Sequence, residues 1–262
     1  MNFKRVLRFG GMIAFAILAV LGYAGVILPE DGTVCGSYAH LAFPRAMLAG
    51  VFLLLLWELG MQHLLRGIAA PKGRALVFCL PALCIALNNF QFLPLLTQDA
   101  TLTITREALG MLLVYALSVG LYEEILFRGC LFPLILQCLG KRRGAPLLAI
   151  LGTSAVFALL HLVNLPVWGA AAVLRQIGYS FLIGAMCAVI LLRTSNLWIC
   201  IFLHGLYDFA GGLMGSFAVG AIWTVPEIVL TACVSVGVAC FYLIWGFRSG
   251  ALLTSPEASD AS

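Results

Sequence analysis

Residues 107–139 read EALGMLLVYALSVGLYEEILFRGCLFPLILQCL, a long apolar run that contains two adjacent carboxylates and an arginine. A helix rises about 1.5 Å per residue and the hydrocarbon layer of a bilayer is about 30 Å thick, so one crossing needs roughly 20 apolar residues. The run does not alternate with a period of two, which favours a helix over a barrel strand. This segment therefore predicts a helical membrane protein that carries charges inside its bundle.

The rest of the chain has the same character. Of its 262 residues, 63% are hydrophobic and 10% are charged, whereas a soluble domain has about 25% charged residues. The net charge is +4, but the basic residues are dispersed among short loops, so no nucleic-acid surface is predicted. The nine cysteines form no Cys-x-x-Cys pair and are interpreted as small apolar side chains.

The apolar runs predict eight membrane-spanning helices in an all-α polytopic bundle. They lie near residues 9–28, 44–65, 75–96, 107–139, 145–163, 171–192, 197–215 and 223–247, with an exterior loop near 29–43. Lys and Arg fall mainly on one side of these spans, opposite Arg45, Arg106 and Arg175, so the positive-inside rule predicts that both termini are cytoplasmic.

The chain is accordingly divided into four parts. We expect three N-terminal helices in 1–106, a motif-bearing core in 107–215, a C-terminal helix in 216–248 and a disordered tail in 249–262. The first apolar run is interpreted as a retained helix, because it is long and lacks a small-x-small cleavage site.

Ionisable groups at membrane depth are costly, by about 2.5–3.5 kcal/mol each on insertion scales, so each needs a partner or a function. Arg128 follows Glu124 by four residues, which places the two on one helical face and predicts an ion pair. Glu123 is rotated by about 100° from Glu124 and is left free. The pair is expected to support the helix geometry, and the free carboxylate is the candidate for chemistry.

Two later spans also carry polar side chains four residues apart. Phe157 and His161 lie in the run near 145–163, and His204 and Asp208 lie in the run near 197–215. Each pair occupies one helical face. A lone histidine in a membrane helix is usually a packing residue, but two of them in the same set of spans as free carboxylates indicate a shared site.

The predicted depth of these residues can be compared. Glu123 lies 19 residues before Arg142 and His161 lies 19 residues after it, so an antiparallel hairpin holds both at one level. His204 lies only about 12 Å of helix rise beyond the turn at Asn196. This distance is shorter than that of Glu123 and His161 from Arg142, and the difference in depth needs an explanation. Pro133 is expected to break the fourth helix and to leave a separate cytoplasmic piece after it.

Three motifs in this order resemble those of the CPBP family, which contains CAAX prenyl proteases and bacteriocin-processing (Abi) proteins. The motifs are Glu-Glu-x-x-x-Arg (Glu123, Glu124, Arg128), Phe-x-x-x-His (Phe157, His161) and His-x-x-x-Asp (His204, Asp208). The resemblance covers about residues 107–215 and implies an intramembrane endopeptidase whose carboxylate and histidines act on water. The family's third motif often ends in Asn, so Asp208 is a departure.

The resemblance and the requirements of peptide hydrolysis suggest a role for each residue. Glu123 acts as the base that activates water, His161 assists the water or the leaving amine, and His204 donates to the oxyanion. Asp208 orients His204. Arg128 holds Glu124, and Phe157 is a supporting residue. No Gly-x-Ser-x-Gly motif is present, so serine chemistry is not predicted.

Metal dependence stays open at this point. Glu123, His161, His204 and Asp208 also suit a zinc site with water as the remaining ligand, although no His-Glu-x-x-His motif is present. We favour a metal-free glutamate mechanism with no cofactor and keep zinc as the alternative.

Two other classes of function compete with the protease. They are a non-catalytic immunity or scaffold protein and a proton-coupled transporter, although no paired repeats typical of transporters are visible. The expected partners are the lipid bilayer and a membrane-associated protein or peptide substrate, and the expected location is a bacterial inner membrane. The substrate itself is not encoded in the sequence.

Overall fold

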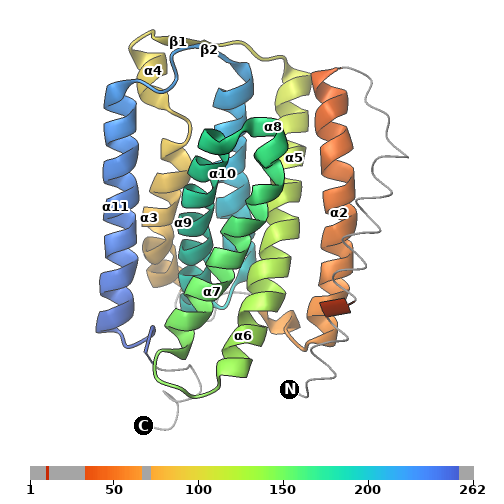
Figure 1. The fold of residues 1–262 in the computed structure, drawn as a ribbon, viewed down its shortest axis with the longest axis vertical. Helices are drawn as coiled ribbons and strands as arrows, with labels where there is room; N and C mark the ends of the chain where they lie inside the picture. The colour runs from red at the N-terminus through yellow and green to blue at the C-terminus, as the bar shows by residue number, and fades with distance from the viewer. Residues whose placement is uncertain (1–9, 12–32, 67–71, 254–262) are drawn as a thin grey trace.

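The computed structural model describes residues 10–11, 33–66 and 72–253 and has the predicted helical bundle (Figure 1). Within these residues, six helical segments are long and apolar enough to cross a membrane, so the chain is a multi-pass membrane protein. These segments are Cys35–Glu58, Arg106–Leu139, Ala145–Trp168, Ala170–Thr194, Leu197–Phe217 and Val225–Arg248. The predicted first span near 9–28 lies outside the described residues, apart from the helical residues 10–11.

Helix α2, Val34–Glu58, begins ten residues before the predicted second span at 44–65. Thr33 accepts a hydrogen bond from the backbone N–H of Gly36 and so caps the helix. Gly60, with φ of +75°, follows its end, and the short 3₁₀ helix η1, Gln62–Leu65, comes after it. The prediction of an exterior loop near 29–43 is therefore wrong from Val34 onward, because Thr33 caps an apolar helix that starts there.

Helix α3, Lys72–Asn88, is shorter than the predicted span at 75–96. The chain turns at Gln91, whose φ is +48°, and resumes as α4, Phe92–Leu96. The part Val77–Asn88 of α3 is an apolar helical stretch that is shorter than the six crossing segments. The predicted number of eight spans is therefore not reached in the described part of the chain.

The fourth predicted span is one continuous element of three parts. Helix α5, Arg106–Glu124, passes into a π-helical segment labelled η2, Ile125–Leu131, and then into α6, Phe132–Leu139. The predicted break at Pro133 is wrong: Pro133 occupies the first turn of α6, where a missing N–H costs least. The wider turn that precedes it is a feature often found at functional sites.

The remaining spans agree with the sequence to within a few residues. They are α7, Ala145–Leu160; η3, His161–Asn164; α8, Leu165–Trp168; α9, Ala170–Thr194; α10, Leu197–Phe217; and α11, Val225–Arg248. Two three-residue strands were not predicted. They are β1, Ala100–Leu102, and β2, Ala218–Gly220, which pair antiparallel with Thr101 opposite Val219 at one end of the bundle.

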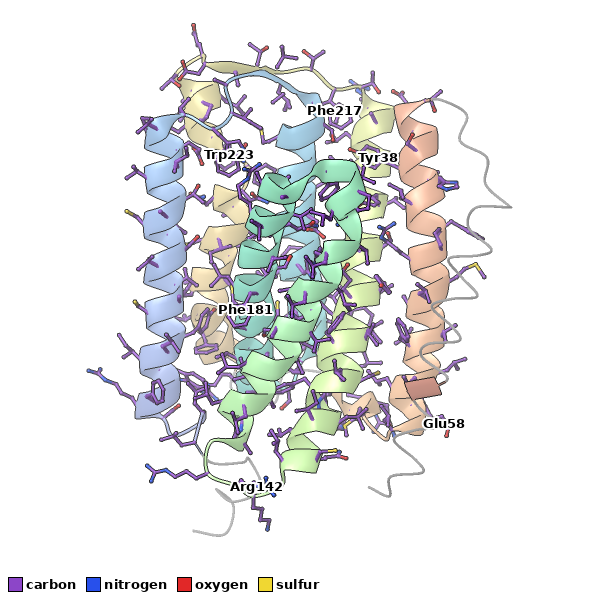
Figure 2. All side chains as sticks on the ribbon, viewed as in Figure 1. Tyr38, Glu58, Arg142, Phe181, Phe217 and Trp223 are labelled. Carbon is purple, nitrogen blue, oxygen red and sulfur yellow. The ribbon has the colours of Figure 1, made fainter. Side chains whose placement is uncertain are left out.

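The two ends of the bundle differ in composition. Arg142, in the loop between α6 and α7, lies at the end opposite Tyr38, Phe217 and Trp223 (Figure 2). Arg193 and Arg248 occupy the last turns of α9 and α11, which finish at the same end as Arg142. The basic end is the one that the positive-inside rule assigns to the cytoplasm, and this orientation stays a prediction.

Helix α5 packs between α2 and α10, and glycines set its closest approach to α10. A Cβ atom added to Gly120 would lie 2.7 Å from the backbone oxygen of Ile201 and 2.9 Å from the backbone nitrogen of Gly205. Small residues allow the backbones of membrane helices to approach closely, and the van der Waals packing that results helps to hold the helices together. The contact fixes the end of α5 against the middle of α10, and both carry motif residues.

The segment after α11 is ordered where it is described, although the sequence predicts a disordered tail from residue 249. Leu252 is buried against Gly246. The backbone oxygens of Leu252 and Leu253 accept hydrogen bonds from the N–H groups of Leu147 and Gly144, at the start of α7. The prediction is therefore wrong for residues 249–253, and residues 254–262 lie outside the described part.

Candidate active site

The first polar group of the site lies where α5 passes into the π-helical segment. Glu124 is fully buried, and its Oε1 lies 3.1 Å from Nη1 of Arg128, which is 1% exposed. The ion pair that the four-residue spacing predicts is therefore present, inside the protein and away from lipid. A buried pair is costly to form and still more costly to break, because removal of one partner leaves an unpaired charge.

Helix α10 brings His204 onto the same carboxylate. Nδ1 of His204 lies 2.7 Å from Oε1 of Glu124, so one buried oxygen contacts both Arg128 and the imidazole. The sequence assigns the orientation of His204 to Asp208, but the shorter contact is made by Glu124. The reason is that α5 and α10 approach closely at their glycines, which places Glu124 nearer to the ring than the acid on the same helix.

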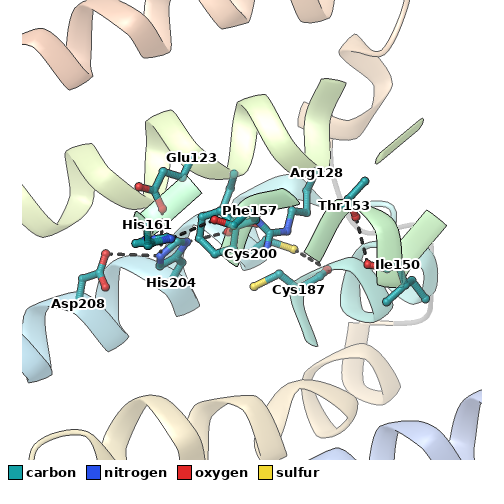
Figure 3. A network of polar contacts seen from close by, with 11 residues as sticks. Glu123, Arg128, Ile150, Thr153, Phe157, His161, Cys187, Cys200, His204 and Asp208 are labelled. Carbon is teal, nitrogen blue, oxygen red and sulfur yellow. Dashed lines mark hydrogen bonds and ion pairs between the residues drawn. The ribbon is translucent and has the colours of Figure 1, made fainter. Parts of the chain in front are cut away.

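The other ring nitrogen of His204 faces two partly exposed carboxylates. Its Nε2 lies 3.6 Å from Oε2 of Glu123 and 3.5 Å from Oδ2 of Asp208 (Figure 3). The side chains of Glu123 and Asp208 are 17% and 25% exposed, whereas that of His204 is 5% exposed. Nε2 therefore points from the buried ion pair toward the accessible side of the site.

Phe157 of α7 lies at the centre of the cluster and is buried. The carbon at the centre of the Arg128 guanidinium lies 4.7 Å from the Phe157 ring centroid, within the range of a cation–π contact. The same ring stands edge to face against His161 and His204, with centroid distances of 5.2 Å and 5.8 Å. Phe157 thus packs against all three of these side chains at once.

His161 ends α7 as its C-cap, where the chain continues into η3. Its Nδ1 hydrogen-bonds to the backbone oxygen of Phe157 at 3.0 Å, which leaves Nε2 for other partners. Figure 3 shows His161 next to Glu123 and His204. The equal spacing of Glu123 and His161 from Arg142 predicts this common level.

The depth of His204 has a simple structural cause. A Cβ atom added to Gly129 would lie 3.1 Å from a side-chain carbon of Leu197, so the start of α10 lies beside the π-helical segment. Helix α6 continues past this point toward the loop that contains Arg142. Helix α10 therefore begins farther from the Arg142 end of the bundle than the point where α6 ends. For this reason, fewer residues separate His204 from the start of its helix than separate Glu123 from Arg142.

Gly184 of α9 completes the surroundings of Arg128. A Cβ atom at this position would lie 2.8 Å from Nη2 of Arg128, 3.2 Å from the Ser154 hydroxyl and 3.3 Å from the Phe157 ring. A side chain at Gly184 would therefore displace the guanidinium. Gly184 was not predicted as a site residue, because its one signal in the sequence is a glycine in the middle of an apolar span.

Arg45 also lies elsewhere than predicted. The sequence places it at the exterior face, whereas the structure places it within α2, with its guanidinium 5.2 Å from the Tyr115 ring centroid. The early start of α2 at Val34 is the cause of the difference. Arg45 is therefore a charged residue at membrane depth that belongs to none of the three motifs.

The residues considered as zinc ligands suit that metal by type, but they do not gather closely. In the described part of the chain, the group with three ligand atoms within 4.8 Å of one another is Glu124, Cys187 and Cys200. Arg128 contacts Glu124, and a cation bound there would have to displace this guanidinium. A zinc ion held by Glu123, His161, His204 and Asp208 would require side-chain movement.

The motif-bearing part of the chain has a counterpart among known families. The protein-family model for type II CAAX prenyl endopeptidase Rce1-like proteins matches residues 105–210. Comparison with curated proteins and with solved structures finds no match. The matched segment runs from the start of α5 to two residues beyond Asp208 and contains all seven motif residues. The match confirms the resemblance that the motifs carry and supports a CAAX-type intramembrane endopeptidase: residues 105–210 are similar to the Rce1-like endopeptidases of the CPBP family.

Proposed function

We propose that this protein is an intramembrane endopeptidase that hydrolyses a peptide bond of a membrane-associated protein or peptide, with Glu123 as the base. The observation that carries the proposal is the difference between two adjacent acids. Glu124 is fully buried and contacts both Arg128 and His204, whereas Glu123 is partly exposed and lies 3.6 Å from Nε2 of His204. A partly exposed carboxylate whose one ion-pair contact is longer than those of its neighbour suits proton transfer with water.

In the proposed reaction, Glu123 takes a proton from a water molecule, and the resulting hydroxide attacks the carbonyl carbon of the scissile bond. The carbonyl π electrons move to oxygen and form the tetrahedral oxyanion. When the oxyanion collapses, the carbonyl re-forms and the C–N bond breaks, and the leaving amine accepts the proton that Glu123 took from water, either directly or relayed through His161. The products are a new carboxylate and an amine, and the base is restored.

His204 is proposed to stabilise the oxyanion. Its Nδ1 donates to Glu124, so Nε2 donates to an oxyanion when the ring is an imidazolium. The carboxylates of Glu123, Glu124 and Asp208, within 3.6 Å of the ring nitrogens, offset that charge. A donor held in place before the reaction needs little reorganisation, which is the basis of oxyanion stabilisation.

A cleavage assay tests the proposal. Purified protein in detergent is incubated with a library of peptides, with and without a chelator, and compared with the variant Glu123→Gln. We expect the parent to cleave and Glu123→Gln to lose about 10²–10⁴-fold in rate, since this is the contribution of a general base. Glu107→Gln is the matched control, because Glu107 is an exposed acid in the first turn of the same helix.

The outcomes separate the alternatives. Activity of Glu123→Gln above about a tenth of the parent would show that Glu123 is not the base. Loss of cleavage with the chelator, restored by zinc, would replace the glutamate mechanism by a metal-dependent one. A parent protein that cleaves neither the library nor a farnesylated CAAX peptide would favour the immunity or scaffold alternative.

A further inference from the structure

A groove on the surface of the bundle runs between α3 and α11, away from the candidate active site. Its volume is about 600 Å³, which is within the range of about 300–1,000 Å³ that is usual for ligand pockets. It lies along the apolar stretch of α3 and the crossing segment of α11, so it faces the hydrocarbon layer. Its apolar lining includes Val77, Pro81 and Cys84 of α3 and Val234, Gly237 and Phe241 of α11.

Two residues that bring little or no side-chain bulk shape the walls of this groove. Gly237 leaves the wall of α11 open, because a Cβ atom added there would meet no atom within 4 Å. Pro81 lies inside α3, where it removes one backbone hydrogen bond of the helix. Of the most apolar window of α11, 11% is buried within the protein, the lowest share among the six crossing segments. Most of α11 is therefore left for contact with lipid.

Aromatic side chains join the two walls at one end of the groove. The ring centroid of Phe78 lies 4.6 Å from that of Trp245 and 5.9 Å from that of Phe241. The hydroxyl of Tyr242, a buried residue, donates to the backbone oxygen of Phe78 at 3.1 Å. These contacts fix α3 against α11, so the groove is formed before anything binds to it.

Basic residues gather at this same end. Helix α3 begins at Lys72 and has Arg74 in its first turn, whereas α11 ends at the exposed Arg248. Both helix ends lie at the end of the bundle that contains the loop between α6 and α7 (Figure 1). Phe241 precedes Arg248 by seven residues, which is about 10 Å of helix rise. Residues 72–88 contain no acid, and Glu227 is at the opposite end of α11, so the charge beside the groove is positive.

From this combination we propose that the groove binds an acyl chain of an anionic phospholipid whose phosphate lies at the basic end, near Arg248. Basic residues at the end of a span attract anionic head groups, and basic pockets between spans bind them. Trp245 stands between the apolar groove and Arg248, which is the level that tryptophan prefers at a membrane interface. The inference does not depend on the proposed reaction, because no residue of the candidate active site takes part in it.

The test measures lipid binding to the full chain by native mass spectrometry, after its release from detergent. The probes are phosphatidylglycerol and phosphatidylcholine with identical acyl chains, each titrated to give the Kd of the first bound lipid. Gly237→Leu fills the groove, and Arg248→Gln removes the charge at its end. The matched controls are Gly110→Leu, where an added Cβ also meets no atom within 4 Å, and Arg106→Gln, at the exposed start of α5.

For the parent, we expect phosphatidylglycerol to bind at least about fivefold more tightly than phosphatidylcholine, as for one or more cations near a phosphate. Arg248→Gln should weaken binding of phosphatidylglycerol by about fivefold and leave that of phosphatidylcholine nearly unchanged. Gly237→Leu should weaken binding of both lipids by about tenfold, as for loss of about two buried CH₂ groups. Both control variants should bind the two lipids like the parent.

Three results would overturn the inference. Equal affinity of the parent for the two lipids would mean that no anionic head group is recognised. Unchanged binding of phosphatidylglycerol to Gly237→Leu would place the lipid elsewhere on the bundle. Dimers of the parent that disappear in Gly237→Leu, with no change in bound lipid, would assign the groove to a second copy of the chain. Thermal unfolding shows whether Gly237→Leu is folded, and the comparison of lipids on the parent and on Arg248→Gln decides the matter if it is not.

Discussion

Two layers of polar side chains meet at the centre of the bundle and differ in how far they are exposed. The inner layer consists of Glu124, Arg128 and His204, which are 0%, 1% and 5% exposed; Arg128 and His204 both contact Glu124. The outer layer contains Glu123 and Asp208, which are 17% and 25% exposed and contact the inner layer through Nε2 of His204. Glu123 and Glu124 are neighbours in the sequence but belong to different layers. We infer that the inner layer provides rigidity and that the outer layer meets the substrate.

The largest effect on stability is expected from removal of a charge from the inner layer. Arg128→Ala leaves Glu124 buried without its cation, which should cost about 3–5 kcal/mol in the free energy of unfolding and should also reduce activity. Thermal unfolding and cleavage are measured together. The control is Arg106→Ala, which removes an exposed arginine from the same helix. If Arg128→Ala were as stable as the parent yet inactive, Arg128 would belong with the groups that contact substrate.

A smaller effect is expected where the layers are held together by helix packing. Gly120→Ala places a methyl group within 2.9 Å of backbone atoms of α10, which cannot move aside as a flexible side chain can. We expect a loss of about 1–3 kcal/mol in stability, as for other overpacked sites, and reduced activity. In Gly110→Ala, on the same helix, the added methyl meets no atom within 4 Å, so stability should stay close to that of the parent. Equal stability and activity of the two variants would show that the close approach of α5 to α10 does not require the glycine at Gly120.

The smallest effect is expected from the outer acid that departs from the family pattern. Asp208→Asn keeps the side-chain volume and its contact with Nε2 of His204, and the shorter Glu124 contact still orients the ring. Activity should stay within about tenfold of the parent, which is 1.4 kcal/mol or less. Elemental analysis of both proteins accompanies the assay. If the parent contained one zinc ion per chain and Asp208→Asn lost both this ion and its activity, Asp208 would be a metal ligand.

The layer assignment of the motif residues was only partly predictable from the sequence. The four-residue spacing predicts the Glu124–Arg128 pair, since it depends on one helix alone. Equal distances from Arg142 predict that Glu123 and His161 share a level, because an antiparallel hairpin is nearly symmetric. The contact of His204 with Glu124 was not predicted, because it depends on how closely α5 approaches α10.

The fold was predictable to a similar extent. The long apolar runs after residue 105 predict their helices well, because hydrocarbon thickness sets the length of a span. The start of α2 at Val34 and the end of α3 at Asn88 were missed, since a threonine cap and a backbone turn at Gln91 decide them locally. The continuous passage through Pro133 was missed as well, because the preceding π-helical segment has no hydropathy signal.

The comparison of two neighbouring variants tests the division into layers most directly. Glu123→Gln and Glu124→Gln are made at adjacent positions with the same change of side chain, and each is measured for thermal unfolding and for cleavage. We predict that Glu123→Gln unfolds like the parent and cleaves about 10²–10⁴-fold more slowly. Glu124→Gln should be clearly destabilised, because Arg128 and His204 lose the charge that both contact. A Glu124→Gln protein as stable as the parent, or a Glu123→Gln protein that still cleaves at the parental rate, would contradict the account.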